Sequence, residues 1–575
     1  MQQTQGTPDT LATLRQAPDT GAPVVARPAS ILMLVRDSAA GMEVFMMQRT
    51  RAADFVPGAN VFPGGAVDDI DGHVSMLEHC SGVDDTWASQ ILGIERNGLS
   101  YWIGAVRECF EESGLLFATG PDGAYVDLNE PQNSARFGEL RRQLNAGELS
   151  FGDMCRQSGV RIAVDKMTYF SHWITPVGIS RRYDTRFFLA VAPPSQTASH
   201  DDNETVANVW IRPQDALDQN EKGEFTLVYA TKVTLQELAC YDSVDELMAH
   251  AHSQREIITM LPRIAFGKAG RRPLSPRDPA YPEVGKIDPL GKGIASYEIE
   301  QGKLVQLAPK VWRITAPNPG YMTGPGTNTY LLGDEQGVTV IDPGPADESH
   351  VKALLEHTPG PIRQIIVTHT HSDHSPAARL LKAQTGAIVM GWPAPPVMHQ
   401  DKDFTPDHQP AHGERIETRA GSLRVIHTPG HTSNHLCYLL EDEKMLFTGD
   451  HIMQGSTVVI SPPDGNMRVY LDSLRMLLDE DIEFLAPAHG FLIDKPARAI
   501  TELIEHRLRR ESLILRALFS HGPTTPEVLL TKVYSSLPEP LKPVAFRSLN
   551  AHLIKLQSEG TVAFDGELWR ALKEL

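Results

Sequence analysis

Short apolar runs that end in turns dominate the second half of the sequence. From about Gln306 they recur as "GVTVIDPGP", "IRQIIVTHTH", "LRVIHTPGH", "KMLFTGDH" and "IEFLAPAHG". Such runs, rich in β-branched residues, predict strands that pack as sheets. Each run carries an Asp or a His at or just before its turn. Because strand ends that converge on one edge of a sheet sandwich gather side chains from distant parts of the sequence, we expect a site at that edge.

The first half predicts a mixed α/β domain. Residues 31–48 alternate as two apolar strands around an Ala-Ala-Gly turn, which predicts a hairpin. Residues 101–113 predict a helix that ends at Gly114. Further strands are expected at 185–192 and 208–211, and a helix with an Asp-Ser cap is expected at "DSVDELMAHAHSQRE".

Composition shifts along the chain predict its division into domains. The stretch "GKAGRRPLSPRDPAYPEVGKIDPLGKG" is rich in Pro, Gly and Arg, which is typical of a linker. After residue 501, two helical segments and a short hairpin predict a small winged-helix module. The predicted organisation is a disordered leader at 1–28, an α/β domain at 29–265, a linker at 266–295, a second α/β domain at 296–500 and the winged helix at 501–575.

Length and composition fit a multidomain globular protein. The 575 residues exceed what one hydrophobic core organises, and 41% hydrophobic with 22% charged residues is ordinary. No apolar run is long enough to span a bilayer, and the polar start lacks the apolar core of a secretory signal, so we expect no membrane partner. Five scattered cysteines without CxxC spacing favour a reducing cytoplasm over a disulfide framework.

The formal net charge of −19 changes the range of expected partners. It argues against broad, nonspecific binding to nucleic acid or to anionic membranes, although a local basic groove stays compatible with it. A small-molecule substrate is therefore the main expectation. The oligomeric state stays open.

The stretch "IIVTHTHSDHSP" concentrates ligand-type side chains at the end of a predicted strand. His369 and His371, one residue apart, can turn toward one ion from a bent loop, and Asp373 and His374 can face a second ion. Imidazole and carboxylate groups suit Zn, Mn or Fe better than a soft thiolate site does. Because four groups leave two coordination shells incomplete, the hypothesis requires further ligands at other strand ends, and the sequence offers His431, Asp450 and His489.

An accidental His-rich turn is the competing interpretation, since the chain contains 22 histidines. For a single histidine that interpretation is the better one. The whole series of His and Asp at successive strand ends favours the metal site. His427 and His435 are weaker candidates that we do not predict as ligands.

The motif HxHxDH, followed by isolated His, Asp and His, resembles the metallo-β-lactamase superfamily over roughly residues 311–496. The resemblance implies an αββα sandwich with two Zn ions (or Mn or Fe) and a bridging hydroxide as the attacking group. One metal would be held by His369, His371 and His431, and the other by Asp373, His374 and His489. Asp450 would bridge the two metals, and Asp373 is also counted as catalytic.

Asp342, in "IDPGP", fits the first motif of that superfamily. By the resemblance it would orient a ligand histidine, and a turn-forming Asp before Pro-Gly is the alternative. The stretch "NPGYMTGPGTNTYLLG" with the helical tail resembles the subgroup of β-lactamase-like protein 2, which includes single-strand endoribonucleases. Asn318, Thr327 and Asn328 would then line the pocket, and turn formation is an equally good explanation for them.

The helical tail gives little support to direct RNA binding. It has a basic face with Arg507, Arg509, Arg510 and Arg516, but residues 501–575 hold ten Lys/Arg and nine Asp/Glu. A charge of about +1 attracts polyanions weakly. We therefore expect the winged helix to pack or dimerise rather than to read nucleic acid.

The helix "AVRECFEESGLL" in the first half carries an acidic face. At 100° per residue, Glu108, Glu111 and Glu112 fall on one side and apolar residues on the other. Three close carboxylates repel one another unless cations lie among them, as Mg²⁺ bound to a polyphosphate does. Arg107 can brace one of these carboxylates. A solvated acidic face is the alternative.

These residues resemble the Nudix box, a Gly, then a Glu, then REUxEExGU. The second half of the box matches, but Gly65 lies far from Arg107 and Leu99 stands where the upstream Glu would fall. An insertion at about 69–100 must interrupt the box. With "FPGG", "WITP" and "RRYDTRFFLA" the region 30–260 is similar to the acyl-coenzyme A diphosphatase subgroup of Nudix hydrolases.

The Nudix resemblance implies an α/β/α sandwich that binds Mg²⁺ or Mn²⁺ through the three glutamates of the helix, with Arg107 among the catalytic residues. Gly64 and Gly65 would contact the substrate. Glu204 is a candidate extra base or metal ligand on a loop, where acidic residues are usually just solvated.

The combined hypothesis is a bifunctional metal-dependent hydrolase. The Nudix half would cleave a nucleoside-diphosphate-linked substrate, with coenzyme A and its acyl derivatives as candidates. The zinc half would hydrolyse an ester, a thioester or a phosphodiester. Three relations between the halves stay open: both act on one ligand, RNA processing is combined with nucleotide clean-up, or one half is an idle nucleotide sensor or scaffold.

Overall fold

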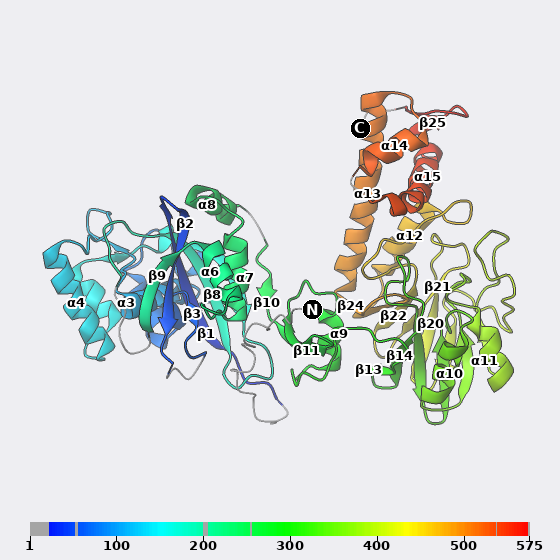
Figure 1. Ribbon diagram of the computed structural model, residues 1–575, viewed down its shortest axis with the longest axis horizontal. Helices are drawn as coiled ribbons and strands as arrows, with labels where there is room; N and C mark the ends of the chain where they lie inside the picture. The colour runs from blue at the N-terminus through cyan, green and yellow to red at the C-terminus, as the bar shows by residue number, and fades with distance from the viewer. Residues whose placement is uncertain (1–21, 52–55, 199–204, 254–255, 536, 573–575) are drawn as a thin grey trace. The chain divides into compact units, whose positions relative to one another are not determined.

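The computed structural model describes residues 22–51, 56–198, 205–253, 256–535 and 537–572, which form two compact units (Figure 1). The first unit runs to Ile264 and includes 271–276 and 290–293, and the second unit contains 265–270, 277–289 and 294 onwards. Most of the predicted leader, residues 1–21, lies outside the described residues. In the described part of the chain, no helix is long and apolar enough to cross a membrane.

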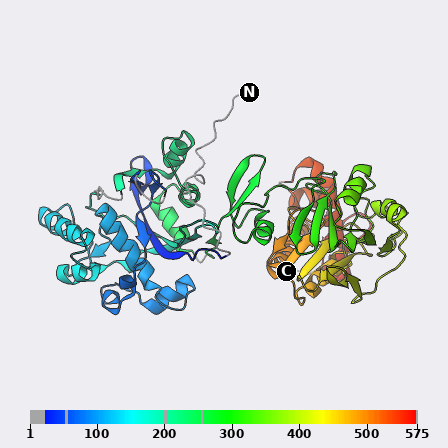
Figure 2. The ribbon, with the colours of Figure 1, turned by 90° about the horizontal axis from the view of Figure 1, so that it is seen from below.

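An eight-stranded sheet with helices on both faces forms the first unit (Figures 1 and 2). Its strand order is β10–β7–β8–β1–β2–β3, with β4 paired to β1 and β9 paired to β2. The strands are β1 (Arg27–Ser38), β2 (Gly41–Arg49), β3 (Asn60–Val61), β4 (Gly64–Ala66), β7 (Thr168–Ile174), β8 (Tyr183–Val191), β9 (Thr205–Ile211) and β10 (Thr259–Met260). The hairpin predicted at 31–48 is confirmed as β1 and β2.

The alternation of buried residues along β1 explains the two layers of helices. Leu32 and Leu34 face one hydrophobic core, whereas Met33 and Val35 face the other. Residues of α2 (Asp85–Leu92), α3 (Leu99–Ser113), α4 (Pro131–Asn145) and α5 (Phe151–Ser158) fill the first core, and residues of α6 (Pro213–Glu221), α7 (Tyr229–Leu238) and α8 (Val244–His252) fill the second. The predicted α/β/α sandwich is confirmed.

The acidic helix lies where the sequence predicted it. It is α3, whose C-cap Gly114 has φ +71°, a conformation that favours glycine. The segment 69–100 that interrupts the Nudix box contains a 3₁₀ turn (Asp69–Gly72), α1 (Val74–Leu77) and α2. The insertion is therefore a folded part of the first unit.

Two six-stranded sheets form the sandwich of the second unit. One sheet orders β13 (Val305–Ala308), β14 (Val311–Thr315), β15 (Asn328–Asp334), β16 (Gly337–Ile341), β17 (Ile362–Ile366) and β18 (Ile388–Met390). The other orders β19 (Arg415–Thr418), β20 (Gly421–His427), β21 (Leu436–Leu440), β22 (Met445–Gly449), β23 (Phe484–Pro487) and β24 (Ile493–Asp494). Tyr330 and Phe447, one from each sheet, lie in the core between them, with ring centroids 4.9 Å apart.

Helices cover the outer faces of these sheets. Apolar residues of α10 (Glu348–His357) and α11 (Ala377–Thr385) pack against the outer face of the first sheet. Apolar residues of α12 (Met467–Leu477) pack against the outer face of the second sheet. The predicted αββα sandwich is confirmed. The polar residues singled out in the sequence follow the ends of β16, β17, β20, β22 and β23.

The C-terminal region has the predicted winged-helix pattern. It contains α13 (Pro496–His521), α14 (Pro526–Val533), α15 (Lys542–Ser558) and the hairpin of β25 (Val562–Phe564) and β26 (Trp569–Ala571). The short helix α14 was not expected. Two arginines of the basic face serve packing: Arg507 is buried against the Tyr470 ring, and the Arg510 guanidinium lies 4.2 Å from the centre of the Tyr534 ring.

The stretch expected to be a linker contains regular structure. It includes β12 (Gly270–Leu274) and α9 (Tyr281–Ile287), and β11 (Arg263–Gly267) enters it. In the second unit, α9 packs against β13 and β24, and its residue Glu283 is buried. The sequence analysis did not predict α9, because its few apolar residues lie among Pro, Gly and Arg. The domain boundaries at 265 and 295 stay predictions.

Candidate metal centre

All seven residues predicted as zinc ligands gather at one edge of the αββα sandwich. They form two groups: His369, His371, His431 and Asp450 in the first cluster, and Asp373, His374 and His489 in the second. In each group the ligand-type atoms lie within 4.8 Å of one another. Four separate loops, which follow β17, β20, β22 and β23, supply these residues. The convergence therefore comes from the sheet topology rather than from the short HxHxDH motif alone.

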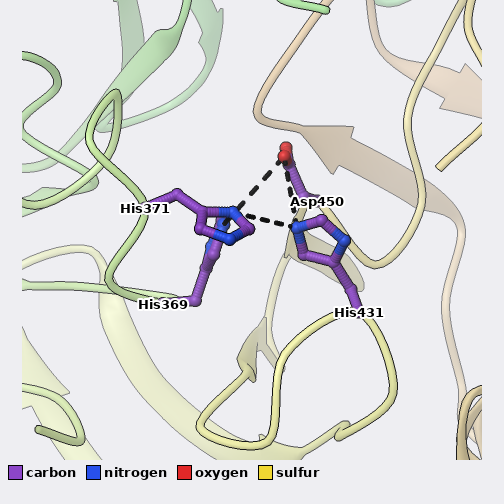
Figure 3. A group of neighbouring side chains, drawn as sticks. All are labelled: His369, His371, His431 and Asp450. Atoms are coloured by element: carbon purple, nitrogen blue, oxygen red, sulfur yellow. Dashed lines mark hydrogen bonds and ion pairs between the residues drawn. The ribbon is translucent and has the colours of Figure 1, made fainter. Parts of the chain in front are cut away.

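In the first cluster, three imidazoles meet one carboxylate (Figure 3). His369 Nε2 lies 2.9 Å from His371 Nδ1, and His431 Nε2 lies 3.1 Å from the same atom. Asp450 Oδ2 is 3.7 Å from His431 Nε2 and 4.0 Å from His369 Nε2. Four donor atoms therefore surround one small space.

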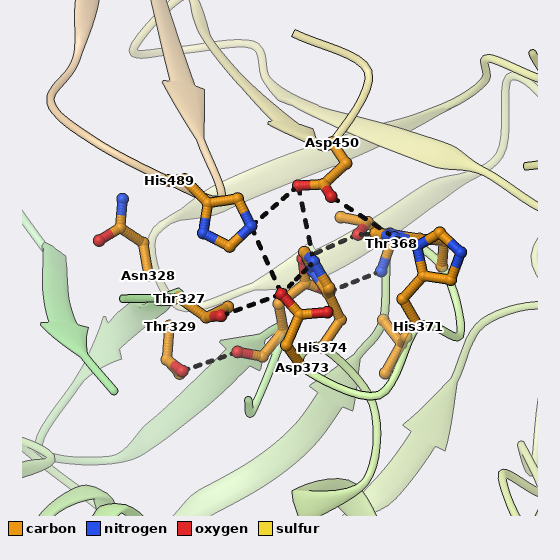
Figure 4. A network of polar contacts seen from close by, with 12 residues as sticks. Thr327, Asn328, Thr329, Thr368, His371, Asp373, His374, Asp450 and His489 are labelled. Atoms are coloured by element: carbon orange, nitrogen blue, oxygen red, sulfur yellow. Dashed lines mark hydrogen bonds and ion pairs between the residues drawn. The ribbon is translucent and has the colours of Figure 1, made fainter. Parts of the chain in front are cut away.

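In the second cluster, the imidazoles of His374 and His489 face the Asp373 carboxylate and also Asp450 of the first cluster (Figure 4). Asp373 Oδ2 lies 3.4 Å from His374 Nε2 and 3.5 Å from His489 Nε2. The other oxygen of Asp450, Oδ1, lies 3.5 Å from His374 Nε2 and 3.2 Å from His489 Nε2. Asp450 thus directs one oxygen to each cluster, which is the geometry that a bridging ligand requires.

Hydrogen bonds on the far side of the rings fix the orientation of three imidazoles. His431 Nδ1 donates to the Val459 carbonyl at 2.7 Å, and His489 Nδ1 donates to the Gly326 carbonyl at 3.2 Å. His374 Nδ1 lies 2.9 Å from Asp342 Oδ2 and donates to it. Each ring therefore directs Nε2 toward the centre, as metal-bound histidines do.

Asp342 has the contacts that its predicted orienting role requires. Besides His374, its carboxylate accepts hydrogen bonds at 2.7 Å from both the backbone N–H and the hydroxyl of Thr368. The residue is buried and has φ +50°, an uncommon conformation for a side chain other than glycine. These contacts hold Asp342 in that conformation.

The electrostatics of the two clusters differ. Burial lowers the pKa of His369 and also that of His371, to about 3, so both imidazoles are neutral and offer lone pairs. Although burial acts in the opposite direction, the carboxylates of Asp450 and Asp373 raise the pKa of His489 to about 9. Cation binding at the second cluster therefore requires the release of protons from its histidines.

The donor set fits divalent cations. His374 Nε2 and Asp450 Oδ1 are buried atoms without a hydrogen-bond partner in the described part of the chain, and such orphaned atoms are costly unless something binds them. Imidazole nitrogen with carboxylate oxygen is the combination that zinc, manganese and iron accept. The residues present therefore fit two ions.

The predicted pocket residues lie directly beside the centre. Asn318 Nδ2 donates to Thr327 Oγ1 at 2.9 Å, and Thr327 Oγ1 donates to Asp373 Oδ2 at 3.3 Å. Asn328 is buried and donates through Nδ2 to the carbonyls of Pro487 and Gly490, 3.0 and 2.8 Å away. Asn328 thus supports the loop that carries His489.

Two further histidines lie close to the first cluster. His435 is buried, its ring stacks on His369 with centroids 5.0 Å apart, and its Nδ1 lies 2.9 Å from Thr428 Oγ1. His427 contacts the Ser433 carbonyl at 3.0 Å. Within the described residues, neither histidine belongs to a cluster able to hold a metal.

In the first unit, Arg107 is the centre of the acidic helix face. Its Nη1 lies 3.0 Å from both Glu108 Oε1 and Glu111 Oε2, so the guanidinium occupies the space between these carboxylates. Among the described residues, the glutamates of α3 do not form a cluster as tight as those around Asp450. Burial raises the pKa of Glu111.

The Gly-Gly turn lies beside this helix despite its distance in sequence. The Gly64 N–H donates to Glu112 Oε2 at 3.1 Å. A Cβ placed on Gly65 would meet the Glu108 carboxylate at 2.6 Å, so a larger residue here would require that carboxylate to shift. The turn therefore lies beside Glu108 and Glu112 of α3. Glu204 lies outside the described residues.

Asp71 is a site residue that the sequence analysis missed. It is fully buried and receives two hydrogen bonds of 2.9 Å from Arg107, through Nε and Nη2. Leu99 stands at the sequence position of the upstream Glu, but the acid that contacts Arg107 comes from the start of the insertion. The available signal was the acidic run "VDDIDG" directly after the Gly-Gly turn.

Comparisons with known proteins identify relatives of the second unit. A family model described as the metallo-β-lactamase superfamily matches residues 322–489. The β-lactamase-like protein 2 homologues of Caenorhabditis elegans and Drosophila melanogaster are 31% and 33% identical to the chain. These matches cover 45% of this chain in each case, and 87% and 91% of the two relatives. The chain belongs to the metallo-β-lactamase superfamily.

The other regions match family models as well. The NUDT19 Nudix domain matches residues 84–230, and the β-lactamase associated winged helix domain matches 525–569. Proteins of the metallo-β-lactamase and Nudix families generally bind divalent metals, and the chain is a hydrolase. Another superfamily member that resembles it, 29% identical over 45% of this chain and 85% of its own length, is named atrochrysone carboxyl ACP thioesterase in Aspergillus chevalieri.

Solved structures resemble each half. A metallo-β-lactamase family protein from Thermus thermophilus is 22% identical, with a TM-score of 0.40, and the match covers 46% of this chain and 100% of that protein. A Nudix hydrolase from Alicyclobacillus acidocaldarius is 25% identical, with a TM-score of 0.33, over 40% of this chain and 97% of that protein.

Replacing Asp71 should destabilise the first unit. In Asp71→Asn the buried Arg107 guanidinium loses the one of its carboxylate partners that is fully buried, which should lower the free energy of unfolding by roughly 3 kcal/mol. Asp68→Asn is the control, because Asp68 lies 3.3 Å from Arg107 but its side chain is 60% exposed, so less than about 1 kcal/mol should be lost. Urea denaturation measures both, and equal losses would contradict the central role of Asp71.

A methyl group at position 449 should disturb the ligand loop. Gly449 has φ +49°, and its Cβ would meet Thr368 Oγ1 at 2.6 Å and His435 Nε2 at 2.7 Å. Gly455→Ala is the control, because Gly455 has φ +81° and nothing within 4 Å of its Cβ position. Denaturant titration should show Gly449→Ala to be less stable than the control by about 1–3 kcal/mol. Equal stabilities would show that the loop relaxes freely.

Proposed function

We propose that the second unit hydrolyses an acyl thioester at a two-metal centre. The observation that carries this proposal is the composition of the loops around the centre. Lys and Arg are absent from 318–327, 368–376, 391–400, 428–435, 451–463 and 487–492. A polyanion such as RNA is bound largely through cationic side chains, and none of these loops offers one.

Exposed apolar side chains on two of these loops support the same substrate class. The side chains of Tyr321 and Met398 are 81% and 78% exposed. The Tyr321 loop is tied to the second cluster through Asn318 and Thr327, and the loop of Met398 is tied to the ligand loop because Gln400 accepts a hydrogen bond from Thr370 at 2.6 Å. An acyl chain gains free energy from burial against such side chains.

A relative named as a thioesterase gives independent support. The Aspergillus chevalieri protein is named for the thioester of an acyl carrier protein, and 85% of its length matches this chain. An acyl thioester is neutral at the reacting carbonyl, so it needs no cationic side chain from the surrounding loops.

The roles of the chain's own residues follow from the contacts of the centre. Two divalent cations, when bound, would supply an acidified water with a pKa near about 7 and would polarise the acyl carbonyl. His369, His371, His431 and Asp450 would hold one ion, and Asp373, His374, His489 and the other oxygen of Asp450 would hold the second. Asp373 has the most exposed side chain of the second cluster, at 24%. It is therefore the group we assign to orient the attacking water by accepting a hydrogen bond from it.

For the first unit we propose Mg²⁺- or Mn²⁺-dependent cleavage of a diphosphate linked to a nucleoside. Glu108, Glu111 and Glu112 would hold the cation, and Gly64 and Gly65, which lie beside Glu112 and Glu108, would contact the substrate. Because burial raises the pKa of Glu111, this carboxylate is a better proton acceptor near neutral pH than a solvated one. Acyl-coenzyme A contains both a thioester and a diphosphate, so one ligand offers a bond to each unit.

The decisive experiment compares three substrates with the zinc-loaded chain: acyl-coenzyme A of several chain lengths, coenzyme A and single-stranded RNA. We expect thiol release from acyl-coenzyme A and no RNA cleavage. RNA cleavage without thiol release would overturn the thioester proposal in favour of the endoribonuclease alternative.

Asp450→Asn should reduce thiol release at least about a hundredfold, because it weakens the ligand shared by both clusters. The control is Asp479→Asn, an exposed aspartate at the end of α12. Thiol release followed with a chromogenic thiol reagent compares the two variants. Full activity in Asp450→Asn would rule out the bridging role.

Glu111→Gln should abolish Mg²⁺-dependent diphosphate cleavage, by about a hundredfold or more, because the amide neither binds the cation well nor accepts a proton. Thiol release should be unchanged. Glu139→Gln on α4, an exposed position, is the control. Chromatography of the nucleotide products measures both variants. Loss of neither activity would remove the support for the Nudix site.

A further inference from the structure

The helix α9 lies before the first strand of the sandwich and outside residues 322–489, which match the superfamily, yet it contributes a buried charge to the second unit. Glu283 on α9 pairs with Arg313 on β14. Its two oxygens lie 2.6 and 2.9 Å from the two terminal nitrogens of Arg313, and both side chains are only 3% exposed. A bidentate pair in this position holds α9 to the sheet with defined geometry.

Glu283 also contacts the loop that carries His489. Its Oε2 accepts a hydrogen bond of 3.0 Å from the backbone N–H of Leu492. Leu492 is three residues after His489, at the end of the short connection between β23 and β24. Asn328 holds the start of the same connection through Pro487 and Gly490. The loop is thus fixed at both ends by buried polar side chains.

His489 depends on its loop more than the other anchored histidines do. The far-side hydrogen bond of its ring, to Gly326, is 3.2 Å long, at the end of the usual range. The corresponding bonds of His431 and His374 are 2.7 and 2.9 Å long. The position of the His489 ring is therefore set largely by the backbone between Pro487 and Leu492.

We propose that Glu283 is a positioning residue for the second metal site. By accepting the Leu492 N–H it holds the His489 loop, and so it sets the cation affinity of the site formed by Asp373, His374 and His489. The first site, with His369, His371 and His431, has no ligand on this loop and is independent of Glu283. The inference rests on the two-metal centre of the proposed function but not on its substrate.

Two double variants separate positioning from charge burial. Glu283→Gln/Arg313→Met removes both charges and keeps an oxygen that accepts from Leu492. Glu283→Leu/Arg313→Met removes both charges and that acceptor. Both avoid an unpaired buried charge, and circular dichroism with urea denaturation establishes that they fold. Cadmium-113 NMR of the full chain, titrated with ¹¹³Cd²⁺, gives one resonance for each occupied site.

In wild type and in the Gln/Met variant we expect two resonances. At each site, the Cd²⁺ affinities of these two proteins should agree within about threefold. In the Leu/Met variant, the affinity of one site should fall about tenfold or more while that of the other stays unchanged. His489→Asn identifies the affected resonance, because it removes a ligand of the second site alone.

Unchanged affinities in the Leu/Met variant would overturn the positioning role. An equal loss at both sites, or the same loss in the Gln/Met variant, would show general destabilisation and would overturn it as well. A wild-type chain that binds fewer than two ions contradicts the two-metal centre itself. Absence of thiol release with normal binding of two ions contradicts the proposed substrate and leaves the inference standing.

Discussion

The carboxylate of Asp450 is the constraint around which the second unit is organised. Each of its oxygens faces a different group of histidines, so both groups must lie within a few ångströms of one side chain. This requirement fixes the relative positions of loops from both sheets. Burying a carboxylate among imidazoles without a binding partner is costly. A bound cation would offset this cost, which explains why these groups converge at one place.

A second layer of polar groups makes this arrangement possible. Asp342 accepts from the His374 ring, and Asn328 donates to the backbone of the His489 loop. Thr368 donates to Asp342, and Asn318 donates to Thr327, which in turn donates to Asp373. The first unit uses the same principle with opposite charges. There a buried cation, Arg107, gathers Asp71, Glu108 and Glu111, and the repulsion between the carboxylates is reduced before any metal ion binds.

The sequence was informative wherever local patterns carried the structure. The strand runs before His369, Asp450 and His489 predicted both sheets and the edge where the site lies, and the acidic face of α3 was visible from its helical period. Asp71 was not visible, because 36 residues separate it from Arg107 and only the folded insertion brings them together. The sequence analysis also missed Glu283. A buried ion pair produces no periodic pattern in the sequence, and the surrounding Pro, Gly and Arg indicated a linker.

The chain passes from one unit to the other several times between 264 and 294. Residues 271–276 and 290–293 belong to the first unit, while 265–270 and 277–289 belong to the second. A shortened chain that begins or ends in this stretch therefore either lacks residues of the unit that it keeps or carries residues of the other unit. No single cut of the chain in this stretch separates all residues of one unit from all residues of the other.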